Sequence, residues 1–288
     1  MFKAILKTVK QEKTKSSLSE QQDIAQIPKI EEKQCQINFN RQIQEYLPYQ
    51  VPNSIEAIFY FKEILTQQQQ EYLMNEIYNQ PKRWVDLPHS NRRVQKYGGD
   101  VKEEGLINVE PLPDFLSQLS NLCFLDDNTL KINHALINEY APGIGIHPHF
   151  DGPLYHNFVN IFSINSTCIF KFKKEDQSLK LFVEPGSLLI FTKQAYTEWL
   201  HGINYHHDDT ILLNIKDNQV CHTDLINFPQ TLLCQNLLKV ENIIEYLNSQ
   251  PNYELCQIQN DNQFTHSLII RRLLRVSITL RHVPYKRM

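Results

Sequence analysis

Short apolar runs separated by turn-forming pairs occupy the middle of the chain and restrict its fold more than any other feature. The turn pairs are Pro142-Gly143, Gly152-Pro153 and Pro185-Gly186. Short runs with such punctuation are typical of a β-sandwich or β-barrel. The runs span residues 135–140, 158–164, 167–172, 179–183 and 188–192. The sequence therefore predicts a domain built on β-sheets.

Two helical segments precede these runs. Thr66 and Gln69 have the spacing of a capping box, which predicts a helix that ends at Pro81. A second helix is expected from Pro113 to about Leu122. Together with the strands, these helices predict a mainly β fold with flanking helices, of the α+β class.

The length of 288 residues suits one large domain with extensions. Residues 1–50 are rich in Lys, Gln, Glu and Ser, which indicates a disordered or loosely helical polar arm before the domain at 51–288. Within that domain, 206–266 break the β pattern and predict an insertion that starts in a polar loop, 206–209, and carries one amphipathic helix. The apolar stripe of this helix comprises Leu233, Leu237, Val240, Ile244 and Leu247.

Charge and cysteine content limit the partners and the compartment. A net charge of -3 argues against sequence-independent nucleic-acid binding by the whole surface, but it leaves room for a small basic site. The six cysteines form no C-x-x-C pair, which indicates reduced thiols in an intracellular protein. No apolar run approaches the ~18 residues of a transmembrane helix, so no membrane association is expected.

A metal site is the first chemical prediction. His149 and Asp151 are two residues apart, and in an extended segment such residues point to the same side. His201 lies in the apolar stretch Trp199–Ile203 and can supply a third ligand. Two histidines and one carboxylate are the ligand set of non-haem iron(II) oxygenases, because they leave metal positions open for a cosubstrate and oxygen.

Two alternatives compete with this set. His207 and Asp209 form a second H-x-D pair with His222 downstream, but the predicted polar loop offers no strand to fix them. His147 lies two residues before His149 and competes as a ligand, although it lacks a carboxylate two residues later.

The last predicted strand, 274–283, alternates strictly. Arg275, Ser277, Thr279 and Arg281 share one face, and apolar residues share the other. An inward face with two arginines is costly to bury unless an anion meets it, and guanidinium is the preferred partner of a carboxylate. The alternative is a solvated face on an edge strand.

With Asn138-Glu139-Tyr140 upstream, the order of these motifs resembles the AlkB family of oxidative demethylases, and within it the AlkB homologue six subfamily. The resemblance spans about residues 55–205 and 270–285. It is carried by the stretches 138–143, 149–155, 184–189, 195–197, 200–203 and 275–284.

The resemblance implies a double-stranded β-helix, or jelly-roll barrel, and the cofactor Fe(II) with 2-oxoglutarate and O2 as cosubstrates. It implies His149, Asp151 and His201 as iron ligands. For 2-oxoglutarate it implies Arg275 with Tyr140 at the far carboxylate, Asn138 and Arg281 at the metal end, and Ser277 beside them. The stretch 84–99 corresponds to a lid over the target nucleotide. Candidate substrate contacts are Trp84, Arg93, Tyr97 and Tyr155.

The function that the resemblance implies is oxidative N-demethylation of a nucleobase in RNA or DNA. Two alternatives stay open: a protein hydroxylase or demethylase on the same fold, and a nucleic-acid-binding module with little turnover. The expected protein is an intracellular monomer, located in the nucleus or the cytoplasm, with nucleic acid as its partner.

Overall fold

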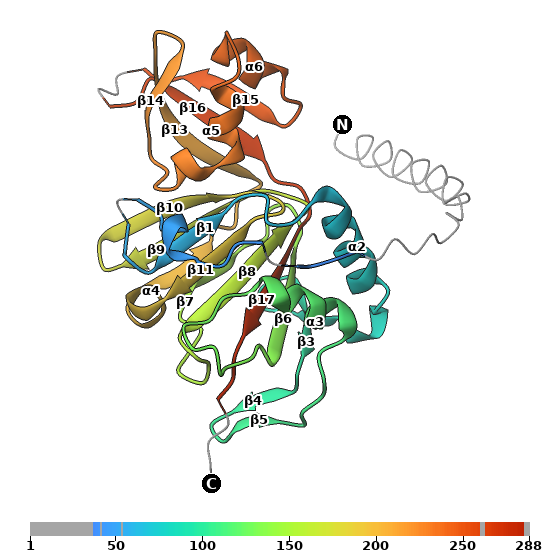
Figure 1. Cartoon of the computed structure of the whole chain (residues 1–288). Helices are drawn as coiled ribbons and strands as arrows, with labels where there is room; N and C mark the ends of the chain where they lie inside the picture. The colour runs from blue at the N-terminus through green and yellow to red at the C-terminus, as the bar shows by residue number, and fades with distance from the viewer. Residues whose placement is uncertain (1–36, 41, 53, 260–262, 285–288) are drawn as a thin grey trace, which may run out of the picture. The chain divides into compact units, whose positions relative to one another are not determined.

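The computed structural model describes residues 37–40, 42–52, 54–259 and 263–284 (Figure 1). Most of the predicted polar arm, residues 1–36, lies outside these. The remainder of the arm differs from the prediction, because Phe39 is buried in the core and Tyr46 packs against it. A short 3-10 helix, η1 (Leu47–Tyr49), follows. The stretch is polar on average, but its aromatic side chains supply the apolar surface that anchors it.

Two antiparallel sheets form the centre of the fold (Figure 1). The major sheet has the order β1 (Ile58–Phe61), β11 (Leu188–Thr192), β8 (Phe158–Ile164), β17 (Arg275–Arg281), β6 (His134–Tyr140), β3 (Arg92–Tyr97) and β2 (Val85–Leu87). The minor sheet has the order β10 (Gln177–Val183), β9 (Cys168–Lys174), β12 (Leu200–Ile203) and β7 (Ile146–His149).

The path of the chain between the sheets defines the fold. From β6 onward the chain enters the major sheet, the minor sheet at β7, the major at β8 and the minor at β9 and β10. It then enters the major at β11, the minor at β12 and the major at β17. This is the winding of a jelly roll, in which the two sheets pack face to face. The predicted double-stranded β-helix is confirmed.

Side-chain alternation on the major sheet explains the layers. On β8, Phe158 and Phe162 join one core, whereas Val159 and Ile161 join the other. The first core lies under α2 (Gln67–Tyr78) and α3 (Asp114–Leu119), and the second fills the space between the sheets. A strand that is buried on both faces reads as a continuous apolar run, which is the pattern of 158–164.

Both helices predicted before the β region are present in the structure. Thr66 caps α2, and Gln69 completes the predicted capping box. The helix expected after Pro113 is α3, extended by the 3-10 turn η3 (Ser120–Leu122). Three smaller elements surround the barrel, namely η2 (Pro81–Arg83), α4 (Lys193–Thr197) and the hairpin of β4 (Asp100–Lys102) and β5 (Gly105–Ile107). Every helix in the described part of the chain is too short or too polar to span a bilayer.

The insertion after His201 is a third sheet and not the single-helix segment predicted. Its order is β14 (Gln219–Thr223), β13 (Asp208–Lys216), β16 (His266–Arg271) and β15 (Tyr253–Gln257), with η4 (Phe228–Gln230), α5 (Leu232–Leu237) and α6 (Ile243–Ser249) between β14 and β15. Its core packs against Ile169 and Phe182 of the minor sheet.

Two details of the insertion correct the sequence reading. The predicted polar loop ends at Asp208, where β13 starts, and Asp209 is buried within that strand. The predicted helix is divided in two because Asn242 caps α6 anew, accepting from the backbone N–H groups of Ile244 and Glu245. Leu233, Leu237 and Leu247 still share one core, and Val240 packs against it, but Ile244 is exposed. The helical spacing therefore predicts burial of most of the stripe, but neither the break nor the exposure of Ile244.

A buried ion pair holds the insertion to the barrel. The Asp209 carboxylate accepts from Arg272 Nη2 at 2.5 Å and Nε at 2.7 Å, and both side chains are 5% exposed. Asp209 also accepts from the backbone N–H of Ile169 in β9, and Arg272 Nη1 donates to the Asn204 carbonyl. Asp209 lies where the chain enters the insertion, and Arg272 lies where it leaves. The ion pair therefore fixes both connections to the minor sheet.

We expect Asp209→Ala to lower the free energy of unfolding by roughly 3–5 kcal/mol, because it leaves the Arg272 guanidinium buried without its counter-ion. Urea denaturation measures this loss. The control is Glu110→Ala, which breaks the exposed Arg83–Glu110 pair and should cost less than about 1 kcal/mol. Similar losses for the two variants would contradict the role given to the buried pair.

Candidate active site

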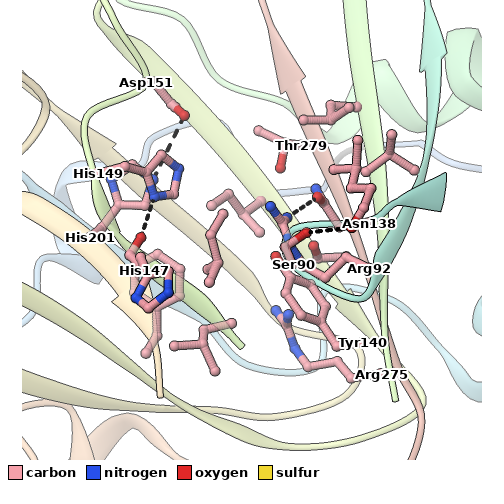
Figure 2. Close-up of a pocket in the computed structure, with 18 of the residues that line it drawn as sticks. Ser90, Arg92, Asn138, Tyr140, His147, His149, Asp151, His201, Arg275 and Thr279 are labelled. Carbon is pink, nitrogen blue, oxygen red and sulfur yellow. Dashed lines mark hydrogen bonds and ion pairs between the residues drawn. The ribbon is translucent and has the colours of Figure 1, made fainter. Parts of the chain in front are cut away.

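The fold brings His149, Asp151 and His201 together (Figure 2). His149 ends β7, and His201 lies opposite it on the neighbouring strand β12. One potential ligand atom from each of the three residues lies within 4.8 Å of the others. His201 Nε2 is 3.7 Å from Asp151 Oδ1. Among the residues that the structure describes, this is the one group of three such side chains able to hold a metal ion.

The surroundings of the two histidines suit metal ligation. His201 is buried, and its ring lies 5.6 Å from the parallel ring of Phe170 and 4.8 Å from that of Phe191. Burial lowers the pKa of His201 to about 4, so the imidazole is neutral at physiological pH. His149 Nδ1 lies 2.9 Å from the His147 carbonyl oxygen, so an Nδ1–H donated there leaves Nε2 free as a ligand.

The carboxylate fits a cation. Asp151 Oδ1 lies 3.1 Å from Arg281 Nη1. Its Oδ2 is buried and has no hydrogen-bond partner among the described residues. A buried carboxylate oxygen without a partner is costly, and a metal ion held with two neutral imidazoles would satisfy it. The residues present therefore fit a divalent iron centre.

The rival ligand set is not assembled. Asp209 is committed to Arg272, and His222 stacks against Phe264 at 5.3 Å. His147 lines the same cavity as His149, but its ring packs against Tyr205 at 4.8 Å.

The polar face of β17 lines a cavity of about 510 Å³ beside the metal-binding group (Figure 2). Strand β6 lies next to β17, and their register pairs Arg275 with Tyr140 and Ser277 with Asn138. These four side chains line the cavity together with Thr279 and Arg281, so all five residues predicted to bind 2-oxoglutarate face it. The alternative of a solvated edge is excluded, because β17 lies inside the sheet and is buried along its whole length.

The two arginines of β17 occupy different ends of the cavity. Arg275 donates to Ser163 Oγ at 2.6 Å, and its Nε and Nη1 are buried without partners among the described residues. Arg281 contacts Asp151 and lies 4.0 Å over the ring of Tyr155. A buried guanidinium with unpartnered N–H groups is costly unless an anion such as a carboxylate meets it. Arg275 therefore offers an anion site away from the metal ligands, and Arg281 lies beside them.

A third cavity arginine, Arg92 of β3, escaped the sequence analysis. Its Nη1 donates to Asn138 Oδ1 at 2.7 Å, and its guanidinium lies 5.7 Å from the Tyr140 ring centroid (Figure 2). Arg92, Val94 and Lys96 all line the cavity. Residues two apart share one face of a strand, so this spacing could have identified Arg92 as a neighbour of Lys96 from the sequence alone.

Three of the predicted substrate contacts, Trp84 before β2 and Arg93 and Tyr97 on β3, require correction. Arg93 points to the opposite face of β3, where it pairs with Glu139 at 2.5 Å and lies 4.5 Å over the ring of Trp84. Tyr97 is buried in the core beneath the helices, and Trp84 packs against that core. The reason is strand alternation, which directs odd-numbered positions of β3 away from the cavity. Of the four candidates, only Tyr155 lines the cavity.

His134 makes the stability of the protein depend on pH. It lies on β6 opposite Arg281, and burial lowers its pKa from 6.5 to about 4. The unfolded chain therefore takes up this proton first, and stability is lost as pH falls from 6.5 towards 4. At about 1.4 kcal/mol per pH unit, the loss reaches roughly 3 kcal/mol.

In metal-free protein, His134→Phe should remove this part of the acid destabilisation, and melting temperatures of both proteins between pH 7 and pH 4 measure it. His201 shifts in the same direction in both, so the difference isolates His134. Parallel losses in the wild type and the variant would show that His134 is protonated equally in the folded and unfolded states.

Comparison with known proteins gives matches over most of the chain. The profile of the 2OG-Fe(II) oxygenase superfamily matches residues 56–281. "Probable RNA/DNA demethylase ALKBH6" of Danio rerio is 32% identical over 185 residues, which cover 58% of this chain and 77% of that protein. "Alkylated DNA repair protein ALKBH8 homolog" of Arabidopsis thaliana is 23% identical over 211 residues, 61% of this chain and 60% of that protein. Among solved structures, that of OsALKBH1 has 13% identity and a TM-score of 0.43, and the match covers 78% of this chain and 96% of that one.

Proposed function

Since this chain belongs to the 2OG-Fe(II) oxygenase superfamily, as an AlkB-like iron dioxygenase, we propose that it removes a methyl group oxidatively from a nucleobase of RNA or DNA. The observation that carries the site assignment is a set of buried polar atoms without partners among the described residues. Those of residues that line the cavity beside the metal ligands are Asp151 Oδ2, the Nε and Nη1 of Arg275, and the Nε atoms of Arg92 and Arg281. A divalent cation is a suitable partner for the Asp151 oxygen, and a dicarboxylate for the Arg275 guanidinium.

We assign His149, Asp151 and His201 as ligands of Fe(II). When bound, the iron supplies the activation of O2 that oxidises a C–H bond. The protein contributes orientation and charge. The His147 carbonyl orients the His149 ring, and Arg281 orients the Asp151 carboxylate.

The proposed orientation of 2-oxoglutarate rests on Arg275 and Arg281, which are the two ends of β17. Arg275 binds the far carboxylate of 2-oxoglutarate with Tyr140 beside it, while Asn138 and Arg281 meet its metal end and Ser277 lies beside them. Arg92 restrains Asn138 through the hydrogen bond to Oδ1. Phe170 lines the cavity and stacks on the His201 ring, and Phe191 packs against the same ring.

The overall reaction balances with these components. One oxygen atom of O2 enters the methyl C–H bond and the other enters succinate, as 2-oxoglutarate loses carbon dioxide. The hydroxymethyl group then leaves the nitrogen as formaldehyde, and the nitrogen keeps a hydrogen. The electrons for O2 come from the keto acid and from the C–H bond.

Two observations support a nucleic-acid substrate. The zebrafish relative bears the name of a probable RNA/DNA demethylase. The cavity is also lined by basic side chains in excess of acidic ones, namely Arg92, Lys96, Arg275 and Arg281 against Asp151. Such an excess attracts the phosphates of a nucleic acid as well as the cosubstrate.

We also propose that the domain spans residues 51–288, with an insertion at 206–266. We propose further that the protein is a monomer and is located in the nucleus or the cytoplasm.

The proposal is tested by 2-oxoglutarate consumption and formaldehyde release with methylated oligonucleotides, using methylated peptides as the competing substrate class. We expect both signals with oligonucleotides. Stimulation by peptides alone would replace the proposed function with protein modification.

A further inference from the structure

The loop that carries Asp151 is fixed by one phenol from a neighbouring helix. This loop joins β7 to β8 and includes Gly152 and Tyr155. Tyr196 of α4 donates its hydroxyl hydrogen to the Gly152 carbonyl, and the hydroxyl oxygen lies 3.3 Å from the Tyr155 carbonyl oxygen. Gly152 has a φ of +91°, so the chain turns directly after Asp151. One hydroxyl group therefore contacts two carbonyls of the turn that follows a candidate metal ligand.

Tyr196 is suited to a permanent restraint. Its ring is buried in the core between the two sheets. A buried tyrosine hydroxyl requires a hydrogen-bond partner, and the loop carbonyls are the partners that it has. Burial, together with the nearby Asp151 carboxylate, raises the pKa of Tyr196 to about 12, so the phenol stays protonated and remains a donor.

The helix that carries this phenol also leads into the strand of another candidate ligand. Helix α4 ends at Thr197, and β12, which contains His201, begins at Leu200. His201 is already held opposite His149 by the pairing of β12 with β7. Tyr196 therefore connects the loop of Asp151, which belongs to no strand, to the segment that positions both histidines.

A second path leads from the same hydroxyl to the Asp151 carboxylate. The Arg281 guanidinium lies 4.0 Å from the centroid of the Tyr155 ring, and Arg281 Nη1 lies 3.1 Å from Asp151 Oδ1. A guanidinium over an aromatic face is attracted to it, so Tyr155 supports Arg281. Tyr196 contacts the loop at Gly152, next to the Asp151 backbone, and at Tyr155, beneath the partner of the Asp151 side chain. Both ends of the Asp151 residue thus depend on one hydroxyl.

We propose that Tyr196 is a positioning residue of the metal centre, which holds the Asp151 carboxylate in place for metal ligation through the Gly152 and Tyr155 carbonyls. The inference rests on the proposed function, because it takes His149, Asp151 and His201 as the ligands. It extends the site to a side chain that lies outside the cavity lining.

The test measures metal affinity with Co(II), a redox-stable probe whose visible absorption reports its coordination. Tyr196→Phe keeps the ring in the core and removes only the hydroxyl. We expect this variant to bind Co(II) about 10- to 100-fold more weakly than the wild type, which is the usual effect of losing a group that orients a ligand. The absorption spectrum of the Co(II)-saturated variant should also differ, because the carboxylate is free to move.

Steady-state kinetics at saturating Fe(II) give a second measurement. The kcat for 2-oxoglutarate turnover should fall about tenfold or more in Tyr196→Phe. The KM for 2-oxoglutarate should change little, because Arg275 holds the far carboxylate. A rise in KM with an unchanged kcat would contradict the role proposed for Tyr196.

The matched control is Tyr60→Phe. Tyr60 is another buried phenol, and it donates to Glu184 Oε2 at 3.1 Å, away from the cavity. Its loss should lower the melting temperature but leave the affinity for Co(II) and the Co(II) spectrum unchanged. Wild-type Co(II) affinity in Tyr196→Phe, or an equal loss in Tyr60→Phe, overturns the inference.

A further variant covers the case in which Tyr196→Phe does not unfold cooperatively. Gly152→Ala adds a Cβ that meets no atom within 4 Å, so it acts through the positive φ alone and displaces the carbonyl that Tyr196 contacts. It should weaken Co(II) binding as Tyr196→Phe does, and wild-type affinity would count equally against the inference.

Failure of the inference and failure of the ligand assignment give different results. If Asp151→Asn loses Co(II) but Tyr196→Phe binds it as tightly as the wild type, only the inference falls. If Asp151→Asn binds Co(II) as tightly as the wild type, the proposed ligand set falls, and the inference falls with it.

Discussion

Replacing Asp151 with asparagine is expected to reduce iron-dependent 2-oxoglutarate turnover by more than about 100-fold while the protein stays folded. Asparagine keeps the shape of the side chain and an oxygen for Arg281 Nη1, but it removes the anionic ligand. Removing groups that merely support metal ligands already costs about 10- to 100-fold in metal affinity or activity. The loss of a ligand should be larger. Metal titration, succinate formation and thermal unfolding are measured on the same preparation.

The matched control is Asp126→Asn. Asp126 pairs with His156 at 2.7 Å, and its side chain is exposed. It should leave turnover within about twofold of the wild type, because an exposed pair contributes little. Normal turnover in Asp151→Asn would remove Asp151 from the ligand set. A variant that no longer unfolds cooperatively would be replaced by His201→Asn, for which the same loss is expected.

Replacing Arg275 with alanine should lower the affinity for 2-oxoglutarate by on the order of 100- to 1,000-fold or more. The guanidinium is buried, with two N–H groups free for a carboxylate. Breaking a buried ion pair by removing one partner costs roughly 3–5 kcal/mol, and each 1.4 kcal/mol is about tenfold. Arg275→Lys should not restore affinity, because an ammonium cannot form two parallel hydrogen bonds.

Arg281 gives an informative contrast. Arg281→Ala should lower turnover more than affinity, because it lies beside Asp151, where the metal already holds the cosubstrate. Arg271→Ala serves as control, since Arg271 is exposed at the end of β16. Titration of 2-oxoglutarate on the metal-loaded protein, paired with initial rates, separates these effects. Wild-type affinity in Arg275→Ala would show that β17 does not bind the dicarboxylate.

The barrel could be predicted because its signals are local. Strand alternation placed Arg275 and Arg281 on one face of β17, and burial inside the sheet made that face part of the cavity. His149 and Asp151 share a side of one extended segment, so they converge whatever the rest of the fold does. The position of His201 opposite His149 is a long-range pairing, so spacing could not predict it. The apolar context of His201 suggested it as a ligand, and the resemblance supported the choice.

The insertion and the lid could not be predicted in the same way. Asp209 reads as a loop residue until Arg272, 63 positions later, is known to neutralise it. On β3 the alternation was readable, but nothing in the sequence states which face meets the cavity. Arg92 was therefore missed and Arg93 was chosen in its place. Pairing of β3 with β6 decides the matter, because it directs Arg92 towards Asn138.

The central claim is tested most directly by mass spectrometry of nucleosides from cellular RNA and DNA treated with the protein, Fe(II) and 2-oxoglutarate. We expect that at least one N-methylated nucleoside declines and its unmethylated parent rises, with formaldehyde released in proportion. Neither change should occur with Asp151→Asn. Unchanged nucleosides in a sample where the wild type turns over 2-oxoglutarate on a protein substrate would contradict the account.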